Sequence, residues 1–173
     1  VELINEKFIV EVWDKNYTEI TIDSSFDDSK RPKVSVNGTT VEIKTPKRNN
    51  VKLINFDDSV SVKLSKSVAA NLFNFDVDIV SGSVNISDIQ CTKASFSTVS
   101  GSIHLDNANL LKLSANSVSG SLKINNCKIE EISAESVSGS INCVADISKS
   151  FELGSVSGSI RLETSTMPVL GGD

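Results

Sequence analysis

The chain has 173 residues and a formal net charge of −5, from 17 basic and 22 acidic side chains spread along its length. This acidic balance disfavours binding to a phosphate backbone, so nucleic acid is not an expected partner. The hydrophobic share of 39% suits one soluble domain, and no apolar run approaches the roughly 18 residues of a membrane span. The chain begins at Val1 without a signal peptide, so we expect any membrane tether to lie outside it.

Residues 1–60 carry no repeat and are predicted to form irregular strands that are either a cap or a set of irregular first coils. Apolar residues alternate over 8–13 and again over 20–22, which is the period of a strand. The segments 33–36 and 39–44 flank Asn37-Gly38. This dipeptide predicts a β-hairpin, because both residues tolerate a positive φ.

Residues 61–173 are organised by the tetrapeptide Val-Ser-Gly-Ser, which occurs five times at a constant spacing of nineteen residues. The copies begin at Val80, Val99, Val118, Val137 and Val156. A fixed period of this size is typical of solenoids, in which each repeat stacks on its neighbours. We therefore predict a single β-solenoid domain over 1–173, with the repeated glycines in single file and the regular phase starting near residue 72.

The apolar positions of each coil, counted from its Val, predict which side chains face inward. The first, fifth and seventh positions are apolar and alternate with polar residues, as in a strand with one buried face. At the fifteenth and seventeenth positions a small residue in one accompanies a large residue in the other, as in Ala94 with Phe96 and Leu113 with Ala115. Such compensation is expected when two columns share one core layer. A corner or bulge is needed between the seventeenth position and the next Val, where the alternation loses phase. Units rich in Ser, Val, Ile and Asn exclude helices, so the fold class is all-β, a parallel β-helix.

The three cysteines, Cys91, Cys127 and Cys143, replace Leu, Ile or Ala in the coils. We predict that they are small core residues, not a disulfide framework or a zinc site. The acidic pairs Asp27-Asp28 and Asp57-Asp58 could bind Ca²⁺, but Asp in turns explains them more simply. No metal or cofactor is expected. The basic residues Lys44, Lys47, Arg48 and Lys52 are interpreted as a solvated face.

Two columns of serine form the candidate binding face. They comprise Ser81, Ser100, Ser119, Ser138 and Ser157 at the second position, and Ser83, Ser102, Ser121, Ser140 and Ser159 at the fourth. Coils spaced about 4.8 Å apart would align their hydroxyls in two rows. The simpler interpretation is that small side chains satisfy one another on a tight surface. The alternative is an array that binds a periodic ligand such as polysaccharide or ice, although ice recognition would favour Thr, which is absent from both columns.

The residues Ser102, His104 and Asp106 are the types of a hydrolytic triad and alternate along one predicted strand. Side chains two apart on a strand stand about 6.6–6.8 Å from each other, which is beyond hydrogen-bond reach. The column of His104 otherwise holds polar and basic residues. We therefore expect this chain not to be an enzyme.

The repeated Ser-Gly-Ser followed by alternating Ile or Leu, with Val62-Lys63-Leu64 before the first regular coil, resembles the bacterial adhesin-like family of unknown function, also called toast-rack domains. The resemblance covers residues 50–165. Family members usually carry Pro after the Leu, where this chain has Ser65, and many carry an acidic residue after the repeated Gly. The resemblance implies a right-handed parallel β-helix, which agrees with the usual handedness of parallel crossovers. It also implies an extracytoplasmic or membrane-tethered module, and it brings no catalytic residues.

Three functions follow as expectations. The first is a non-enzymatic binding or scaffold module at the cell envelope that presents flat faces to a protein or glycan. The second is a carbohydrate-active enzyme, since larger β-helices host such activities. The third is self-assembly through the C-terminal coil, because an uncovered end of a β-helix exposes unpaired backbone groups.

Overall fold

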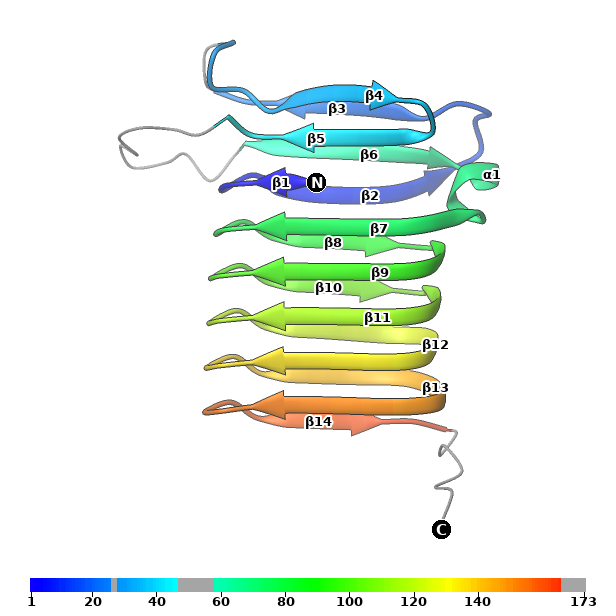
Figure 1. The fold of residues 1–173 in the computed structure, drawn as a ribbon, viewed down its shortest axis with the longest axis vertical. Coiled ribbons are helices and arrows are strands. Elements are labelled where there is room, and N and C mark those ends of the chain that lie inside the picture. The colour runs from blue at the N-terminus through cyan, green and yellow to red at the C-terminus, as the bar shows by residue number, and fades with distance from the viewer. Residues whose placement is uncertain (26–27, 47–57, 166–173) are drawn as a thin grey trace.

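A computed structural model describes residues 1–25, 28–46 and 58–165. Within these ranges the protein is a flattened β-solenoid of fourteen strands in two facing layers, with one short helix (Figure 1). The predicted all-β solenoid with nineteen-residue coils is confirmed. None of the helices in the described ranges is long and apolar enough to cross a membrane.

Each regular coil contributes one strand to each layer. One layer contains β8 (Val84–Ser87), β10 (Ile103–Asp106) and β14 (Ile160–Glu163), and the other contains β7 (Leu72–Ile79), β9 (Gln90–Thr98) and β11 (Asn109–Ser117). The longer β12 (Leu122–Ser136) and β13 (Ile141–Ser155) run through both. Residues paired between regular coils are nineteen apart, as where Ile103 lies between Val84 and Leu122, so like residues stack on like. The exception is a short stretch of β12 and β13, where register shifts make Cys127 pair with Ala145 and Ile129 with Ile147, eighteen residues apart.

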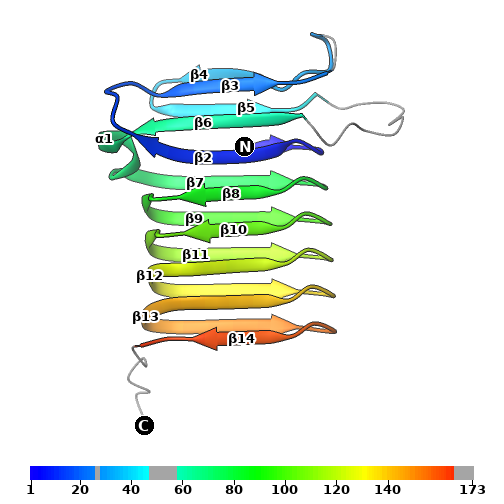
Figure 2. The same cartoon turned by 180° about the vertical axis from the view of Figure 1, so that it is seen from behind.

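The solenoid is right-handed. In Figure 1 the strands β7, β9 and β11 lie on the near side and point left, whereas β8 and β10 lie behind them and point right as the chain descends. Figure 2 shows the same winding from behind. This sense agrees with the handedness expected for parallel crossovers.

The first strands form an additional coil that the repeat did not reveal. β1 (Glu2–Leu3) pairs in parallel with β7, and β2 (Lys7–Trp13) pairs in parallel with β8 and with β6 (Ser59–Ser65). The helix α1 (Lys66–Ala69) connects β6 to β7 and so passes this inserted coil. The regular coils start with β7 at Leu72, and part of segment 1–60 forms an irregular coil that precedes them in the parallel stack.

The N-terminal end of the stack is covered by antiparallel strands. β3 (Glu19–Asp23) pairs with β6, and β4 (Lys33–Asn37) forms a hairpin with β5 (Thr40–Lys44). The hairpin confirms the prediction, but its turn is displaced by one residue. Asn37 pairs with Thr40 inside the ladder, and only Gly38 has a positive φ, of 60°. Gly at the first central position is typical of a type II′ turn, which needs one positive φ rather than two.

The core is a set of continuous columns between the two layers. In the coils from β8 to β12 the fifth, seventh, tenth, twelfth, fifteenth and seventeenth positions are all buried. Three phenylalanines pack inside the N-terminal coils, with ring centroids 6.4 Å apart for Phe8 and Phe75 and 6.0 Å apart for Phe75 and Phe96. Bulky residues in neighbouring columns thus fill one close-packed layer.

The cysteines are free thiols inside this core. Burial raises the pKa of the Cys127 and Cys143 thiols to about 11, and it also raises the pKa of the Cys91 thiol. Thiols with a raised pKa are poor nucleophiles and poor metal ligands, because the thiolate is the reactive form. The prediction of small core residues is confirmed.

The repeated Val at the first position is exposed, contrary to the prediction that it faces inward. Val80, Val99, Val118 and Val137 are each 47–49% exposed. The alternation of buried residues continues from the seventeenth to the nineteenth position, so the residue that enters the core beside each corner is Ile79, Thr98, Ser117 or Ser136. The phase breaks after Val, where two successive residues point outward, and not before it.

Candidate binding surface

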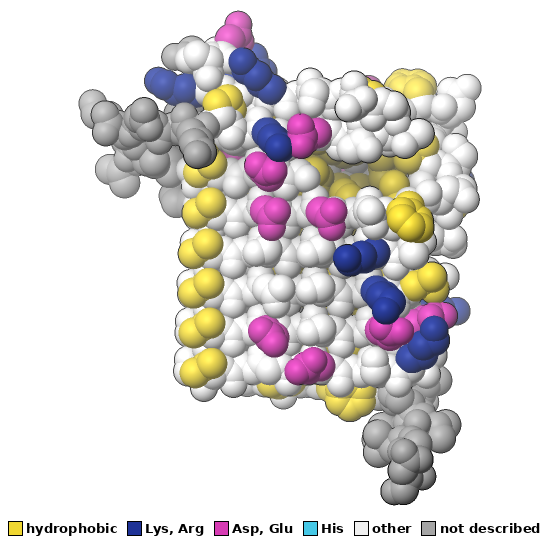
Figure 3. Space-filling model, viewed as in Figure 1, with side chains coloured by type: hydrophobic (Ala, Val, Ile, Leu, Met, Phe, Trp, Pro, Cys, Tyr) yellow, Lys and Arg dark blue, Asp and Glu magenta, His cyan; other side chains and the backbone are white. Residues whose placement is uncertain are grey.

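The exposed valines form a continuous apolar ridge along one edge of the molecule. This valine ridge consists of Val80, Val99, Val118, Val137 and Val156. It is visible as a file of hydrophobic side chains at the left edge of Figure 3, beside a mostly polar face. Each valine follows the same strand end in successive coils, so neighbouring members stand about 4.8 Å apart.

The corner that carries the ridge is closed by hydroxyl groups under it. The side-chain oxygen at the nineteenth position accepts a hydrogen bond from the N–H of the Gly three residues later. This bond is 2.8 Å long at Thr98, 2.7 Å at Ser117, 2.9 Å at Ser136 and 2.8 Å at Ser155. A short hydroxyl side chain can satisfy a turn N–H that the ladder leaves unpaired. This role explains why polar residues occupy a buried column.

The repeated glycines lie in single file, as predicted. A Cβ atom added at Gly101, Gly120, Gly139 or Gly158 would lie well under 3.0 Å from the carbonyl oxygen of the preceding glycine in the column. Backbones therefore approach at this corner more closely than any side chain allows. The tight corner fixes the direction in which each preceding Val projects.

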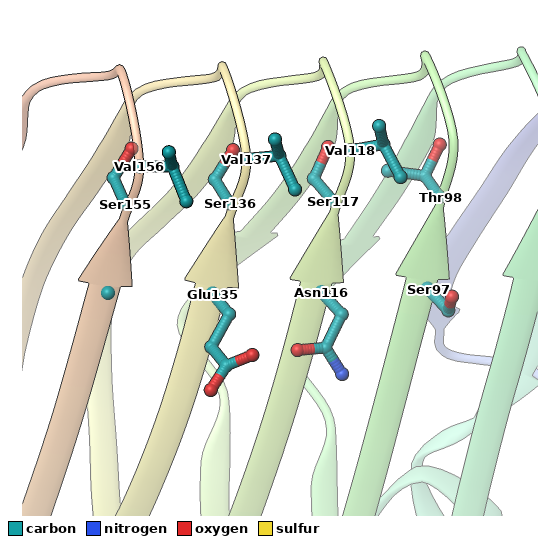
Figure 4. Close-up of a pocket in the computed structure, with 11 residues that line it drawn as sticks. Ser97, Thr98, Asn116, Ser117, Val118, Glu135, Ser136, Val137, Ser155 and Val156 are labelled. Atoms are coloured by element: carbon teal, nitrogen blue, oxygen red, sulfur yellow. The ribbon is translucent and has the colours of Figure 1, made fainter.

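A groove runs beside the valine ridge on the long-strand layer, with a volume of about 440 Å³. Val118, Val137 and Val156 form one wall, and Thr98, Ser117, Ser136 and Ser155 form the floor. Figure 4 shows Asn116 and Glu135 on the opposite side, each one residue before a floor residue. We call this feature the corner groove. It combines an apolar wall with a polar wall, and its direction is that of the stack.

The serine columns lie outside the corner groove and are partly occupied by internal hydrogen bonds. In the second-position column, the hydroxyls from Ser100 onward donate to the carbonyl of the Val in the preceding coil, at 3.1 Å for Ser119, 3.2 Å for Ser138 and 3.3 Å for Ser157. Ser81 donates instead to Ile4 O and Asn5 Oδ1 of the first coil. These serines thus satisfy the backbone and not one another. In the fourth-position column, Ser159 donates to Ser140 at 3.1 Å. The glycine file separates the two columns, so they do not form one flat array.

Ser102, His104 and Asp106 are not assembled into a catalytic group. Asp106 accepts a hydrogen bond from Asn125 Nδ2 at 3.1 Å, and His104 Nδ1 is buried without a hydrogen-bond partner among the described residues. Burial, followed by the nearby Lys123 ammonium, lowers the pKa of His104, and Asp106 partly opposes this shift. A triad needs the base hydrogen-bonded to both of its partners.

The structure describes only some residues of the two acidic pairs and of the basic cluster, and those residues have separate partners. Asp27, Asp57, Lys47, Arg48 and Lys52 lie outside the described residues. Asp58 is buried and accepts hydrogen bonds from the backbone N–H of Ser25 and the hydroxyl of Ser24. Asp28 forms an ion pair with Arg31, and Lys44 pairs with Glu2 and Glu42. Over residues 1–25, 28–46 and 58–165, no group of three or more His, Cys, Asp or Glu residues could hold a metal ion.

The sequence profile of the Toastrack DUF4097 family matches residues 2–168. The chain belongs to the Toastrack family. The match extends beyond the regular coils, so the inserted N-terminal coil and the antiparallel cap lie within the Toastrack unit as well. Separate comparisons of this Toastrack chain with curated proteins and with solved structures found no match.

Proposed function

We propose that this Toastrack chain is a non-enzymatic binding module of the bacterial cell envelope, and that it presents the corner groove to an elongated protein or glycan partner. The observation that carries the proposal is the valine ridge. Val recurs at every one of these corners although it is about half exposed at four of them and 82% exposed at Val156. A solvent-facing corner has no need of an apolar residue, and contiguous exposed apolar surface is typical of interaction sites.

The shape of the groove favours an elongated partner over a compact small molecule. The groove extends over successive coils and presents the same wall at each step of the ladder. Its floor hydroxyls already accept hydrogen bonds from glycine N–H groups. Specificity would therefore come from the polar wall, where Ser97, Asn116 and Glu135 differ from coil to coil.

The proposal predicts that a double substitution, Val118→Asp and Val137→Asp, abolishes binding without unfolding the protein. Both side chains are about half exposed, so carboxylates remain hydrated there while the apolar wall is lost. Binding is measured by co-sedimentation with bacterial envelope fragments that retain cell-wall glycan and membrane proteins. We expect the wild type to sediment with the fragments and the double variant to stay in solution.

Leu111→Asp is the matched control. Leu111 is exposed to a similar degree but lies outside the groove, so its variant should bind like the wild type. Treating the fragments with a muramidase or with a protease before mixing separates a glycan partner from a protein partner. Equal binding by the double variant and the wild type would refute the role of the groove. A wild type that never sediments with the envelope would refute the proposed function itself.

A further inference from the structure

The two ends of the solenoid differ in how they are covered. At the N-terminal end, the antiparallel strands β3 and β4 lie over the stack (Figure 1). At the opposite end, β14 pairs with β13 and with no other described strand. One edge of β14 therefore carries backbone N–H and C=O groups without a partner in the described part of the ladder. Such an edge is a template for pairing with another strand.

Among the described residues, the last positions of the core columns at this end are also exposed. Ile160 is 43% exposed, whereas the residues above it in the same column are 0–1% exposed. Those residues are Val84, Ile103, Leu122 and Ile141. In the facing layer Phe151 is 43% exposed, although Ile132 directly above it is buried. Apolar area thus accompanies the unpaired edge in both layers.

The sequence of β14 is complementary to itself. Arg161 and Glu163 point outward on either side of Leu162, and Arg161 Nε donates to Glu163 Oε1 at 2.8 Å. If a second β14 lies antiparallel and is centred on Leu162, each Arg161 faces Glu163 of the other copy, and the two Leu162 side chains face each other. Opposite charges and paired apolar residues are the favourable cross-strand combinations.

We propose that β14 is the docking edge for a second copy of this chain, which gives a tail-to-tail dimer with both layers continued across the interface. A two-fold axis perpendicular to the layers places β14 of one copy antiparallel to β14 of the other. The same axis places the exposed end of β13 in one copy near the exposed end of β13 in the other. Such an interface is isologous and closed, so assembly stops at two copies. The axis moves the corner groove to the opposite edge, so dimerisation and groove binding are independent.

Charge reversal on β14 tests the proposal, with sedimentation velocity of the full chain from low micromolar to near-millimolar concentration as the measurement. The wild type should shift from monomer to dimer. Arg161→Glu places two carboxylates opposite each other at both symmetric positions, which should weaken dimerisation at least about tenfold. The double variant R161E/E163R restores opposite charges and should restore the dimer. Lys123→Glu makes the same change of charge in the same column two coils away and should have no effect.

Two results would overturn the dimer. A wild type that remains monomeric at every concentration would mean that the edge is covered within one chain. A dimer that is unaffected by R161E would mean that another surface mediates association. Far-UV circular dichroism and the melting temperature of each variant show whether the monomer is intact. Loss of the dimer in R161E with recovery in R161E/E163R cannot arise from unfolding. None of these outcomes depends on the corner groove, so failure here leaves the envelope-binding proposal standing.

Discussion

Replacing Gly120 with alanine is expected to lower the free energy of unfolding by at least about 3 kcal/mol. The new Cβ would lie well under 3.0 Å from the carbonyl oxygen of Gly101. That oxygen belongs to backbone held by the ladder, as in the bond from Ser119 N to the carbonyl of Val99 at 2.9 Å, so it cannot yield without separating two coils. Urea unfolding followed by circular dichroism measures the loss.

Gly154→Ala is the matched control for this prediction. Gly154 lies in β13 outside the glycine file, and a Cβ there meets nothing closer than Glu135 Cγ at 3.9 Å. Alanine fits this position and restricts the unfolded chain, so the variant should be as stable as the wild type or more stable by up to about 1 kcal/mol. Equal destabilisation by the two substitutions would mean that the glycines do not stack.

The second large effect is expected for Leu122→Ala, which should lower the free energy of unfolding by about 2–5 kcal/mol. Leu122 is fully buried at the fifth position in the middle of the stack, between Ile103 and Ile141. Truncation removes methyl groups from a column whose neighbours are held in place by the ladder, so the cavity cannot collapse fully. Thermal and urea unfolding both report this loss.

Val118→Ala tests whether Val118, in the same coil as Leu122, faces the solvent and not the core. Val118 is 47% exposed on the valine ridge, so truncating it should cost less than about 1 kcal/mol. The sequence pattern alone would place both residues in the core and would predict similar losses. A cost for Val118→Ala that matches Leu122→Ala would contradict the outward orientation of the ridge.

Much of the fold follows from the sequence because the repeat is strict. The constant spacing of Val-Ser-Gly-Ser predicts the coil length, the single file of glycines and the buried fifth and seventh positions, all of which the structure contains. Alternation is informative there because the strands on either side are straight and half buried.

The apolar periodicity does not predict the valine ridge, because it does not locate a corner. An apolar residue that recurs in every coil is expected in the core, and the polar Thr98, Ser117 and Ser136 are expected at the surface. In the structure the repeated Val is exposed and these three polar residues are buried. The deciding interaction is the hydrogen bond from a glycine N–H to a hydroxyl three residues earlier, which keeps that hydroxyl inside. The spacing of Ser or Thr three residues before Gly was the available signal.

The inserted N-terminal coil cannot be recognised as a repeat, for a different reason. Register places Leu3 beside Ile79 and Phe8 beside Val84, so Ile4-Asn5-Glu6-Lys7 occupies the place of Val-Ser-Gly-Ser in the next coil. Ile4-Asn5-Glu6-Lys7 and Val-Ser-Gly-Ser have no residue type in common at any position. The corner of the first coil is held by the Glu6 side chain and not by a glycine. Its carboxylate accepts the N–H groups of Ile4 at 2.9 Å and Asn5 at 3.0 Å. A side-chain acceptor can replace a tight glycine corner, and no repeat search detects the exchange.

The stacking of coils is tested most directly by pulsed electron–electron distance measurements between spin labels on the second-position serine column. One label stays at Ser157 and the other is placed at Ser119, Ser100 or Ser81 in turn, in a background without the three buried cysteines. The distance should grow by about 4.8 Å for each coil between the labels. Distances that fail to increase in equal steps along this series would show that the nineteen-residue units do not lie above one another.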